Sequence, residues 1–182
     1  MHIGLQGQFA SWAGTLIGIG PSLVLVAEDA KSAEESIVRL ARVGIEKVEG
    51  YLDGGVLAWQ QDGRPLAEVP QISALQLYEQ LCDQPDLVQV IDVRRPMEWE
   101  TGHLERAVLK PLHQLRDCHP DLDGSKPIAA HCKSGYRSSI ATSILKAAGF
   151  QQVMNVVGGL DAWQAHGLPI VKDACKAATH PG

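Results

Sequence analysis

The sequence, 182 residues long, predicts an α/β fold in which helices cover both faces of a parallel β-sheet. Short apolar runs of strand length alternate along the chain with longer segments whose apolar residues recur at helical spacing. This alternation is typical of parallel sheets, because parallel strands need crossover connections. A second observation is an internal repeat, which predicts one complete copy of the fold and a partial copy before it.

Three pairs of short segments carry the repeat. Leu40–Ile45 is echoed by Leu145–Phe150, Gly54–Trp59 by Gly158–Trp163, and Gly63–Leu66 by Gly167–Ile170. The spacing between paired positions changes by one residue after the first pair, so one copy carries a one-residue gap. We therefore expect a partial module over residues 1–66, a linker over 67–72, a complete module over 73–172 and a tail over 173–182.

The complete module is expected to begin with a helix over Ser73–Leu81. Apolar residues lie near one face of this helix, namely Leu75, Leu77, Tyr78 and Leu81. Gly149 is expected to end the helix that reaches Ala148. The other expected elements are a strand over Leu87–Asp92, a helical turn over Pro96–Gly102, a strand over Ala107–Leu109, a turn over Pro111–Arg116, a strand over Ile128–His131, a helix from the next loop to Ala148, a strand over Val153–Val157 and a helix over Leu160–Ala165.

The partial module has counterparts only for the second half of the complete one. These are a strand over Leu23–Ala27, a helix over Ser32–Val43, a strand over Val48–Tyr51 and the Gly-Gly turn before Trp59; upstream lie only His2–Leu5 and an apolar segment, Phe9–Ile17. Nothing corresponds to residues 73–102. Because a sheet without its first strands exposes edges and apolar faces, we expect this module to pack on the complete one, to form a homodimer, or to derive from a longer parent.

Composition narrows the function classes. The net charge of −5 and the absence of a basic run argue against a nucleic-acid partner. The apolar runs are too short to span a membrane, and the first residues lack the layout of a secretory signal, so a cytoplasmic protein is expected. The four cysteines, Cys82, Cys118, Cys132 and Cys175, show no CxxC spacing. Reduced thiols, without a metal or another cofactor, are therefore expected.

The segment His131–Ser139, HCKSGYRSS, is the strongest candidate site. Cys132 ends a predicted strand and is followed by a polar loop and a helix, so free backbone N–H groups and the helix dipole should point at its sulfur. Together with the cations Lys133 and Arg137 they favour the thiolate, which can attack sulfur, phosphorus or carbon. The residues expected to bind a substrate are Lys133, Ser134, Gly135, Tyr136, Arg137 and Ser138.

The charged residues near this loop are expected to support it or to contact the substrate. Arg137 is expected either to pair with Asp92 at the end of a strand or to orient an anionic substrate. Asp92 is expected to be structural, as a loop brace or a cap. Arg94 and Arg95 are expected to form a solvated pair at the pocket rim, with Arg94 either supporting the loop or contacting a donor. His103 is expected to make a structural hydrogen bond.

The positions of the remaining histidine and tryptophan residues, and of the partial module, also predict their roles. His131 is expected to point away from Cys132, because adjacent strand residues face opposite sides. Trp59 and Trp163 are expected to be core or packing residues of the Gly-Gly turns. In the partial module the repeat places Ala27, or a neighbour, where Cys132 stands, and the acidic segment Glu28–Ala33 where the basic loop stands. A supporting or docking role, without catalysis, is therefore expected for that module.

Four motifs in order resemble the signatures of the rhodanese family of sulfurtransferases. They are Val90–Arg94, then Glu98 with Gly102–Leu104 and Ala107, then His131–Ser138, then Gly158–Trp163. The tandem also resembles the C-terminal region of fusion proteins in which a metallo-β-lactamase-fold persulfide dioxygenase precedes rhodanese units, although the zinc-binding motif of that enzyme is missing here. The resemblance implies a rhodanese-like parallel sheet, with a persulfide dioxygenase as a possible partner.

The resemblance further implies double displacement through a Cys132 persulfide. The sulfur would come from thiosulfate or a low-molecular-weight persulfide and pass to a thiol or cyanide. Two alternatives stay open. One is a cysteine-dependent phosphatase, whose loop places five residues between cysteine and arginine where this chain has four between Cys132 and Arg137. The other is a non-catalytic docking or sulfur-relay module of a persulfide-oxidising system.

Overall fold

The computed structural model describes residues 1–118 and 120–172. It divides the chain between Glu68 and Val69 into two compact units, which are described separately below. The side chain of Cys118, together with His119, Cys175 and the rest of the expected tail, lies outside the described residues. None of the described helices has the length and apolar character needed to cross a membrane.

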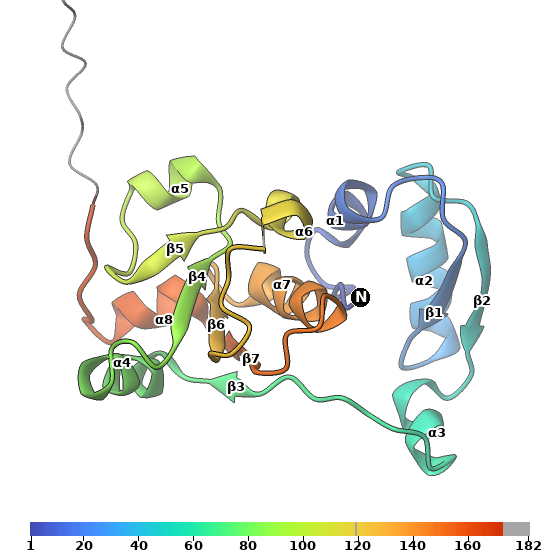
Figure 1. Cartoon of the computed structure of the whole chain (residues 1–182). Helices are drawn as coiled ribbons and strands as arrows, with labels where there is room; N and C mark the ends of the chain where they lie inside the picture. The colour runs from blue at the N-terminus through green and yellow to red at the C-terminus, as the bar shows by residue number, and fades with distance from the viewer. Residues whose placement is uncertain (119, 173–182) are drawn as a thin grey trace, which may run out of the picture. The chain divides into compact units, whose positions relative to one another are not determined.

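The larger unit is a five-stranded parallel sheet with helices on both faces (Figure 1), which confirms the predicted fold class. Strand order is β3-β7-β6-β4-β5. The strands are β3 (Gln71–Ile72), β4 (Gln89–Asp92), β5 (Ala107–Leu109), β6 (Ile128–His131) and β7 (Val153–Val156), and the helices are α4 (Ala74–Asp83), α5 (Pro96–Glu100), the 3-10 turn η1 (Leu112–Gln114), α6 (Leu115–Cys118), α7 (Tyr136–Ala147) and α8 (Gly159–Ala165).

The inner strands of the larger unit's sheet are buried on both sides, and every residue of the central strand β6 is buried, whereas Val108 of the edge strand β5 is 52% exposed. Helices α4 and α8 cover one face, where Leu77 packs in one cluster with Ala129, Val156 and Trp163. Helix α7, with η1 and α6, covers the other face. Burial on both sides explains why these strands appear in the sequence as continuous apolar runs.

Helix α4 is fixed at its start by reciprocal hydrogen bonds. Ser73 Oγ accepts from the backbone N–H of Gln76 at 3.1 Å, and Gln76 Oε1 accepts from the Ser73 N–H at 2.9 Å. Tyr78 then meets Trp163 of α8 edge to face, with ring centroids 5.7 Å apart. Strand β3, just before this helix, lies within the stretch expected to be a linker and pairs with β7 at the edge of the sheet.

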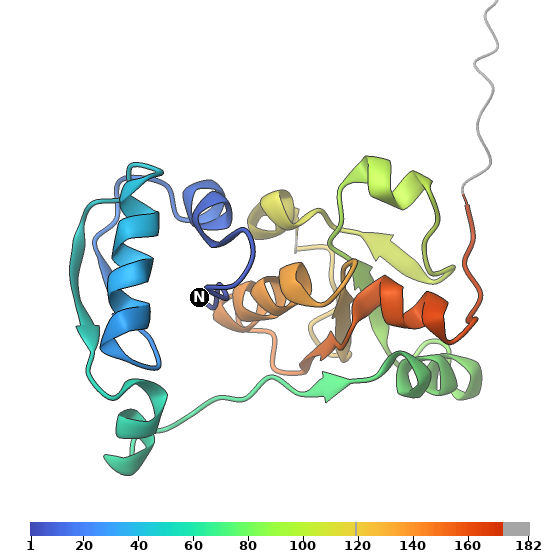
Figure 2. The same cartoon turned by 180° about the vertical axis from the view of Figure 1, so that it is seen from behind.

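The smaller unit contains α1 (Phe9–Leu16), β1 (Leu23–Val26), α2 (Ala30–Ala41), β2 (Val48–Leu52) and α3 (Gly55–Gln61). Its two strands form a parallel pair, and helices α1 and α2 supply one apolar cluster built on Phe9, Ala13, Leu40 and Ile45. Figure 2 shows the same helices from behind. This unit therefore has two strands where the complete module has five, with α1 and α2 packed in one apolar cluster beside them.

The two units repeat the same turn before their last helix. Gly55 follows β2 with φ 57°, and a Cβ there would lie 2.3 Å from the Ala27 carbonyl oxygen; at Gly159, with φ 53°, it would lie 2.4 Å from the Cys132 carbonyl oxygen. The Trp59 and Trp163 indoles also donate to equivalent carbonyls, those of Pro65 and Pro169. Ala27 is therefore the structural counterpart of Cys132.

The one-residue gap of the repeat lies in β2. Leu23 pairs with Val48, but Val24 pairs with Gly50, so a β-bulge surrounds Glu49. In the larger unit the corresponding pairs run without interruption, from Ile128 with Val153 to Ala129 with Met154. The extra residue of the first copy is therefore absorbed where two strands meet, and the register after it is the same in both units.

Candidate active site

Cys132 lies between β6 and α7, at the carboxyl edge of the sheet where sites of parallel sheets form. Its Sγ accepts a hydrogen bond from the backbone N–H of Gly135 at 3.2 Å and a weaker one from Ser138 Oγ at 3.6 Å. Gly135 has a φ of 99° and is the residue from which α7 starts, so the chain turns sharply around the sulfur. Only 1% of Cys132 is exposed.

The loop presents further backbone donors. Among the described residues, no acceptor is found for the N–H groups of Lys133, Ser134, Arg137 and Ser138. They belong to the loop and the first turn of the twelve-residue helix α7, where N–H groups have no partner within the helix. Unpaired amides at a helix N-terminus make a site for an anion.

Arg137, in the first turn of α7, is held by α5. Its two terminal nitrogens donate to Glu98 Oε2 at 2.6 Å and Oε1 at 2.7 Å. These bonds lower the pKa of Glu98 to about 2, and the same pair raises the pKa of Arg137. The expected pairing of Arg137 with Asp92 is therefore wrong, because α5 places Glu98 against α7 and another arginine already occupies Asp92.

That other arginine is Arg94, which is 3% exposed beside the fully buried Asp92. Its Nε lies 3.0 and 2.8 Å from the two oxygens of Asp92, and its Nη2 lies 2.7 Å from Oδ2. The remaining donors reach the carbonyls of Glu98 at 3.0 Å and Gly102 at 2.8 Å. The expected solvated position of Arg94 is therefore wrong, because its side chain folds back two residues to satisfy a buried carboxylate.

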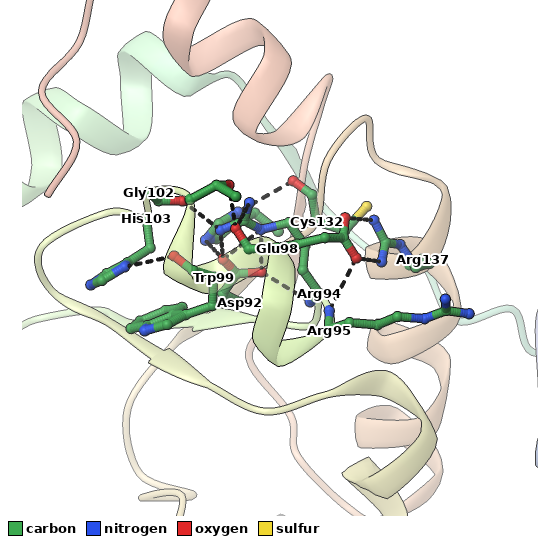
Figure 3. A network of polar contacts seen from close by, with 11 residues as sticks. Asp92, Arg94, Arg95, Glu98, Trp99, Gly102, His103, Cys132 and Arg137 are labelled. Carbon is green, nitrogen blue, oxygen red and sulfur yellow. Dashed lines mark hydrogen bonds and ion pairs between the residues drawn. The ribbon is translucent and has the colours of Figure 1, made fainter. Parts of the chain in front are cut away.

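These contacts form one continuous connection from β4 to the cysteine loop (Figure 3). Asp92 holds Arg94, Arg94 holds the C-terminal carbonyls of α5, and Glu98 of α5 holds Arg137 beside Cys132. Arg95, in contrast, is exposed; its backbone N–H donates to Glu98 Oε2 at 3.1 Å, and no dashed line in Figure 3 reaches its guanidinium. Glu98 was not among the predicted site residues, although Pro96 followed by an acidic residue is a recognised helix start that would place it in the first turn.

Two buried histidines lie near the same edge. His131 stands opposite Asp92 in the sheet, its Nε2 is 3.7 Å from Asp92 Oδ2, and burial lowers its pKa, so the ring is neutral near pH 7. His103 Nδ1 lies 3.2 Å from the Trp99 carbonyl oxygen and its ring stacks on Trp99 at 3.5 Å. Among the described residues, no group of three metal-binding side chains occurs.

A pocket of about 300 Å³ adjoins the cysteine loop. Exposed Lys133 is the loop residue that reaches it. Its lining consists of Arg94, Met97, Glu98, Thr101, Gly102, Lys133, Leu160, Asp161 and Gln164. The start of α8 lies beside the cysteine loop, because the N–H groups of Leu160 and Asp161 donate to the carbonyls of Cys132 and Lys133. The sequence prediction missed the α8 residues, for which the repeated Gly-Gly turn was the available signal.

Residues 73–166 match the sequence model of the rhodanese-like domain. The chain belongs to the rhodanese-like family. It is similar to a sulfurtransferase of Allochromatium vinosum, with 33% identity over 103 residues, 57% of this chain and 95% of that protein. A rhodanese-related protein of Thermoplasma volcanium has the same fold, with a TM-score of 0.52, 31% identity, and coverage of 56% of this chain and 97% of that one.

Other rhodanese-like relatives carry names from the same chemistry. The thiosulfate sulfurtransferase GlpE of Coxiella burnetii is 31% identical over 96 residues, which are 53% of this chain and 88% of that protein. The putative sulfur carrier protein YrkF of Bacillus subtilis is 33% identical over 97 residues, 53% of this chain, and the match spans about half of YrkF, 52%. At the level of the family, this rhodanese domain is a sulfurtransferase domain.

The Glu98–Arg137 pair gives the rhodanese domain a pH-dependent contribution to stability. Because the folded-state pKa of Glu98, about 2, lies below its ordinary 4.5, the pair stabilises the fold above pH 4.5 and loses this effect as the pH falls toward 2. The Glu98 side chain is 31% exposed, so we expect only about 1 kcal/mol. Urea unfolding of wild type and Glu98→Gln should show this difference at neutral pH and none near pH 2.

The exposed neighbour Glu100, on the same helix, provides the control. Glu100→Gln should unfold with the wild-type free energy across the same pH range. A Glu98→Gln difference that persists unchanged at the acid end would show that the carboxylate does not act through its ion pair with Arg137.

Proposed function

We propose that Cys132 carries sulfur, as a persulfide, between a small sulfane-sulfur donor and a thiol or cyanide acceptor. The observation that supports this most directly is the position of Cys132 Sγ at the start of α7, with Gly135 N–H and Ser138 Oγ donating to it. The names of two relatives, a sulfurtransferase and a thiosulfate sulfurtransferase, support the same chemistry.

The first step is attack of the Cys132 thiolate on the outer sulfur of the donor. With thiosulfate, the new S–S bond forms as the S–S bond of the donor breaks, and its electron pair leaves with sulfite. In the second step the acceptor attacks the outer sulfur of the Cys132 persulfide. Cyanide leaves as thiocyanate, or a thiolate leaves as a new persulfide, and the Cys132 thiolate is regenerated.

The loop residues have separate tasks in this scheme. The outer persulfide sulfur is anionic, and the amides of Lys133, Ser134 and the first turn of α7 stabilise it as they would an anion. Exposed Lys133 attracts the anionic donor at the pocket. Arg137 adds positive charge while Glu98 fixes its position. Asp92 and Arg94 support the loop through α5.

A second candidate, a sulfur relay for a protein partner, is favoured by the 1% exposure of Cys132. A buried sulfur is less open to small acceptors than to a partner that reshapes the loop. The name of a relative, putative sulfur carrier protein, agrees with this role. In a relay the persulfide forms in the same way, but small thiols and cyanide discharge it slowly.

Mass spectrometry of the intact protein tests both candidates. Treatment with thiosulfate should add about 32 Da, one sulfur atom, to Cys132, and cyanide or a thiol should then remove it. Because the tandem resembles the rhodanese region of persulfide dioxygenase fusions, glutathione persulfide is the second donor to test. An adduct that small acceptors leave in place supports the relay, and the absence of an adduct with either donor contradicts both candidates.

The turn at Gly159 offers a test of loop geometry. In Gly159→Ala the new Cβ would meet the Cys132 carbonyl at 2.4 Å and the Lys133 carbonyl at 2.8 Å, so the loop must move. We expect at least about 10-fold lower kcat/KM for thiosulfate and cyanide, because small misplacements cost large rate factors, and a stability loss of about 2 kcal/mol.

Gly55→Ala is the matched control for this substitution, since its Cβ would meet the Ala27 carbonyl at 2.3 Å in the equivalent turn. It should lose similar stability and keep kcat/KM within about twofold when assayed well below its unfolding temperature. Equal losses of activity in the two variants would contradict the assignment of the site to Cys132.

A further inference from the structure

The smaller unit leaves one face of its sheet uncovered. Val24 and Val26 of β1 are 69% and 58% exposed, while their neighbours Leu23 and Leu25 pack against the helices on the other side. Helix α3 adds Val56 and Trp59, which are 53% and 36% exposed. We name this surface the open face. It consists of Val24, Val26, Leu52, Val56 and Trp59.

Each residue of the open face has a buried counterpart in the larger unit. The shared turn and strand register pair Val24 with Ala129, Val26 with His131, Leu52 with Val156, Val56 with Leu160, and Trp59 with Trp163. The five counterparts are between 0% and 6% exposed. The open face is therefore a surface that the fold normally covers, and large apolar side chains remain on it.

The larger unit also shows what covers this surface. Helix α4 lies over Trp163 and Val156 through Leu77, Tyr78 and the partly buried Leu81. Just before α4, β3 adds a strand to the free edge of β7, where the N–H groups of Asn155 and Val157 donate to the carbonyls of Pro70 and Ile72. In the described part of the smaller unit, no strand pairs with the outer edge of β2.

The charges around the open face define the occupant further. Exposed carboxylates lie near it in sequence, Glu28 after β1, Glu49 in the bulge and Asp53 after β2, and one cation, Arg64, has its guanidinium 5.0 Å from the centroid of the Trp59 ring. The three carboxylates would attract a helix with basic residues beside its apolar stripe. The charged residues of α4, Glu79 and Asp83, are acidic, so the occupant differs from α4 in net charge while sharing its apolar pattern.

We propose that the open face is a docking site for a strand–helix segment of a partner. The segment adds a short strand to the outer edge of β2 and lays an amphipathic helix, apolar on one side and basic at its flanks, over Val24, Leu52, Val56 and Trp59. The affinity comes from main-chain bonds at the edge and from apolar burial under the helix. This inference does not depend on the chemistry of Cys132.

The proposal can be tested with the chain's own covering segment as the probe. A second copy of Gln71–Asp83, with Cys82→Ser, is joined to the N-terminus of the full chain through a Gly/Ser linker of about 20 residues, whose root-mean-square span is about 25 Å. Tethering gives an effective concentration in the millimolar range. Hydrogen exchange of amides in residues 48–61 should slow at least about 10-fold, while exchange in β4 (89–92) stays unchanged.

Three variants make the result specific to the open face. Leu77→Asp and Leu81→Asp in the appended copy should abolish the protection, because they destroy its apolar stripe. Val24→Asp in the smaller unit should do the same, and since Val24 is exposed the unit should still fold. Protection that survives Val24→Asp, or no protection with the intact copy, would overturn the proposal.

The untethered chain supplies a separate check. Light scattering after gel filtration should show that Val24→Asp leaves its molar mass unchanged. A dimer that Val24→Asp dissociates would overturn the proposal by assigning the open face to a second copy of this chain.

Discussion

Replacing Cys132 by serine is expected to reduce thiosulfate-dependent sulfur transfer by at least about 10⁴-fold, to the uncatalysed background. A serine hydroxyl stays protonated near pH 7 and is a poor nucleophile toward sulfur. It therefore does not attack the donor, and no persulfide forms. Steady-state assays with cyanide as acceptor, together with intact mass after donor treatment, measure both effects.

Two features separate this loss from unfolding. Serine is close to cysteine in size and can keep the hydrogen bonds from Gly135 N–H and Ser138 Oγ, so Cys132→Ser should unfold within about 1 kcal/mol of wild type. Cys82→Ser removes the exposed thiol of α4 and should keep full activity. Transfer that continues in Cys132→Ser would place the sulfur on another residue and end the proposed mechanism.

Arg94→Met is expected to cause the largest loss of stability, about 3–5 kcal/mol. The substitution leaves the carboxylate of Asp92, which is 0% exposed, without its ion-pair partner, and a buried unpaired charge is costly. It also removes the donors to the Glu98 and Gly102 carbonyls, which hold α5. Urea unfolding followed by circular dichroism gives the free-energy difference.

Matched variants test the physical cause of this loss. Arg95→Met removes the adjacent, exposed arginine and should change stability by less than about 0.5 kcal/mol. Adding Asp92→Asn to Arg94→Met should recover part of the loss. The buried side chain at position 92 is then uncharged, and its oxygen can still accept from the backbone N–H of residue 94. A loss below about 1 kcal/mol in Arg94→Met would show that the pair does not support α5.

Local patterns were sufficient for the fold class and for most elements. The strands Ala107–Leu109 and Ile128–His131 have the predicted bounds, because each is a short, mostly apolar run enclosed by residues that end a strand. The helix bounds differ by at most two residues, since helix ends depend on caps. Strand β3 was not predicted, because two residues carry no periodicity and only their pairing with β7 makes them a strand.

The arginines were the main error at the candidate site. Arg94 and Arg95 are adjacent and chemically identical, yet one is buried and the other exposed. No local pattern separates them, because the difference comes from the direction each side chain takes after β4 and from the position of Asp92. The partner of Arg137 is likewise set by the packing of α5 against α7, across 39 residues of sequence.

The sequence by itself determined the features that depend on residues close together in the chain. These are the repeat, the alternation of strands and helices, and a cysteine between a strand and a helix. The tertiary structure alone decided which charges meet, since ion pairs such as Glu98–Arg137 depend on how separate elements pack. It alone also showed that Val24, Val26 and Val56 are exposed. Burial of a side chain depends on elements distant in sequence, and in the smaller unit the element that would cover these residues is missing from the described fold.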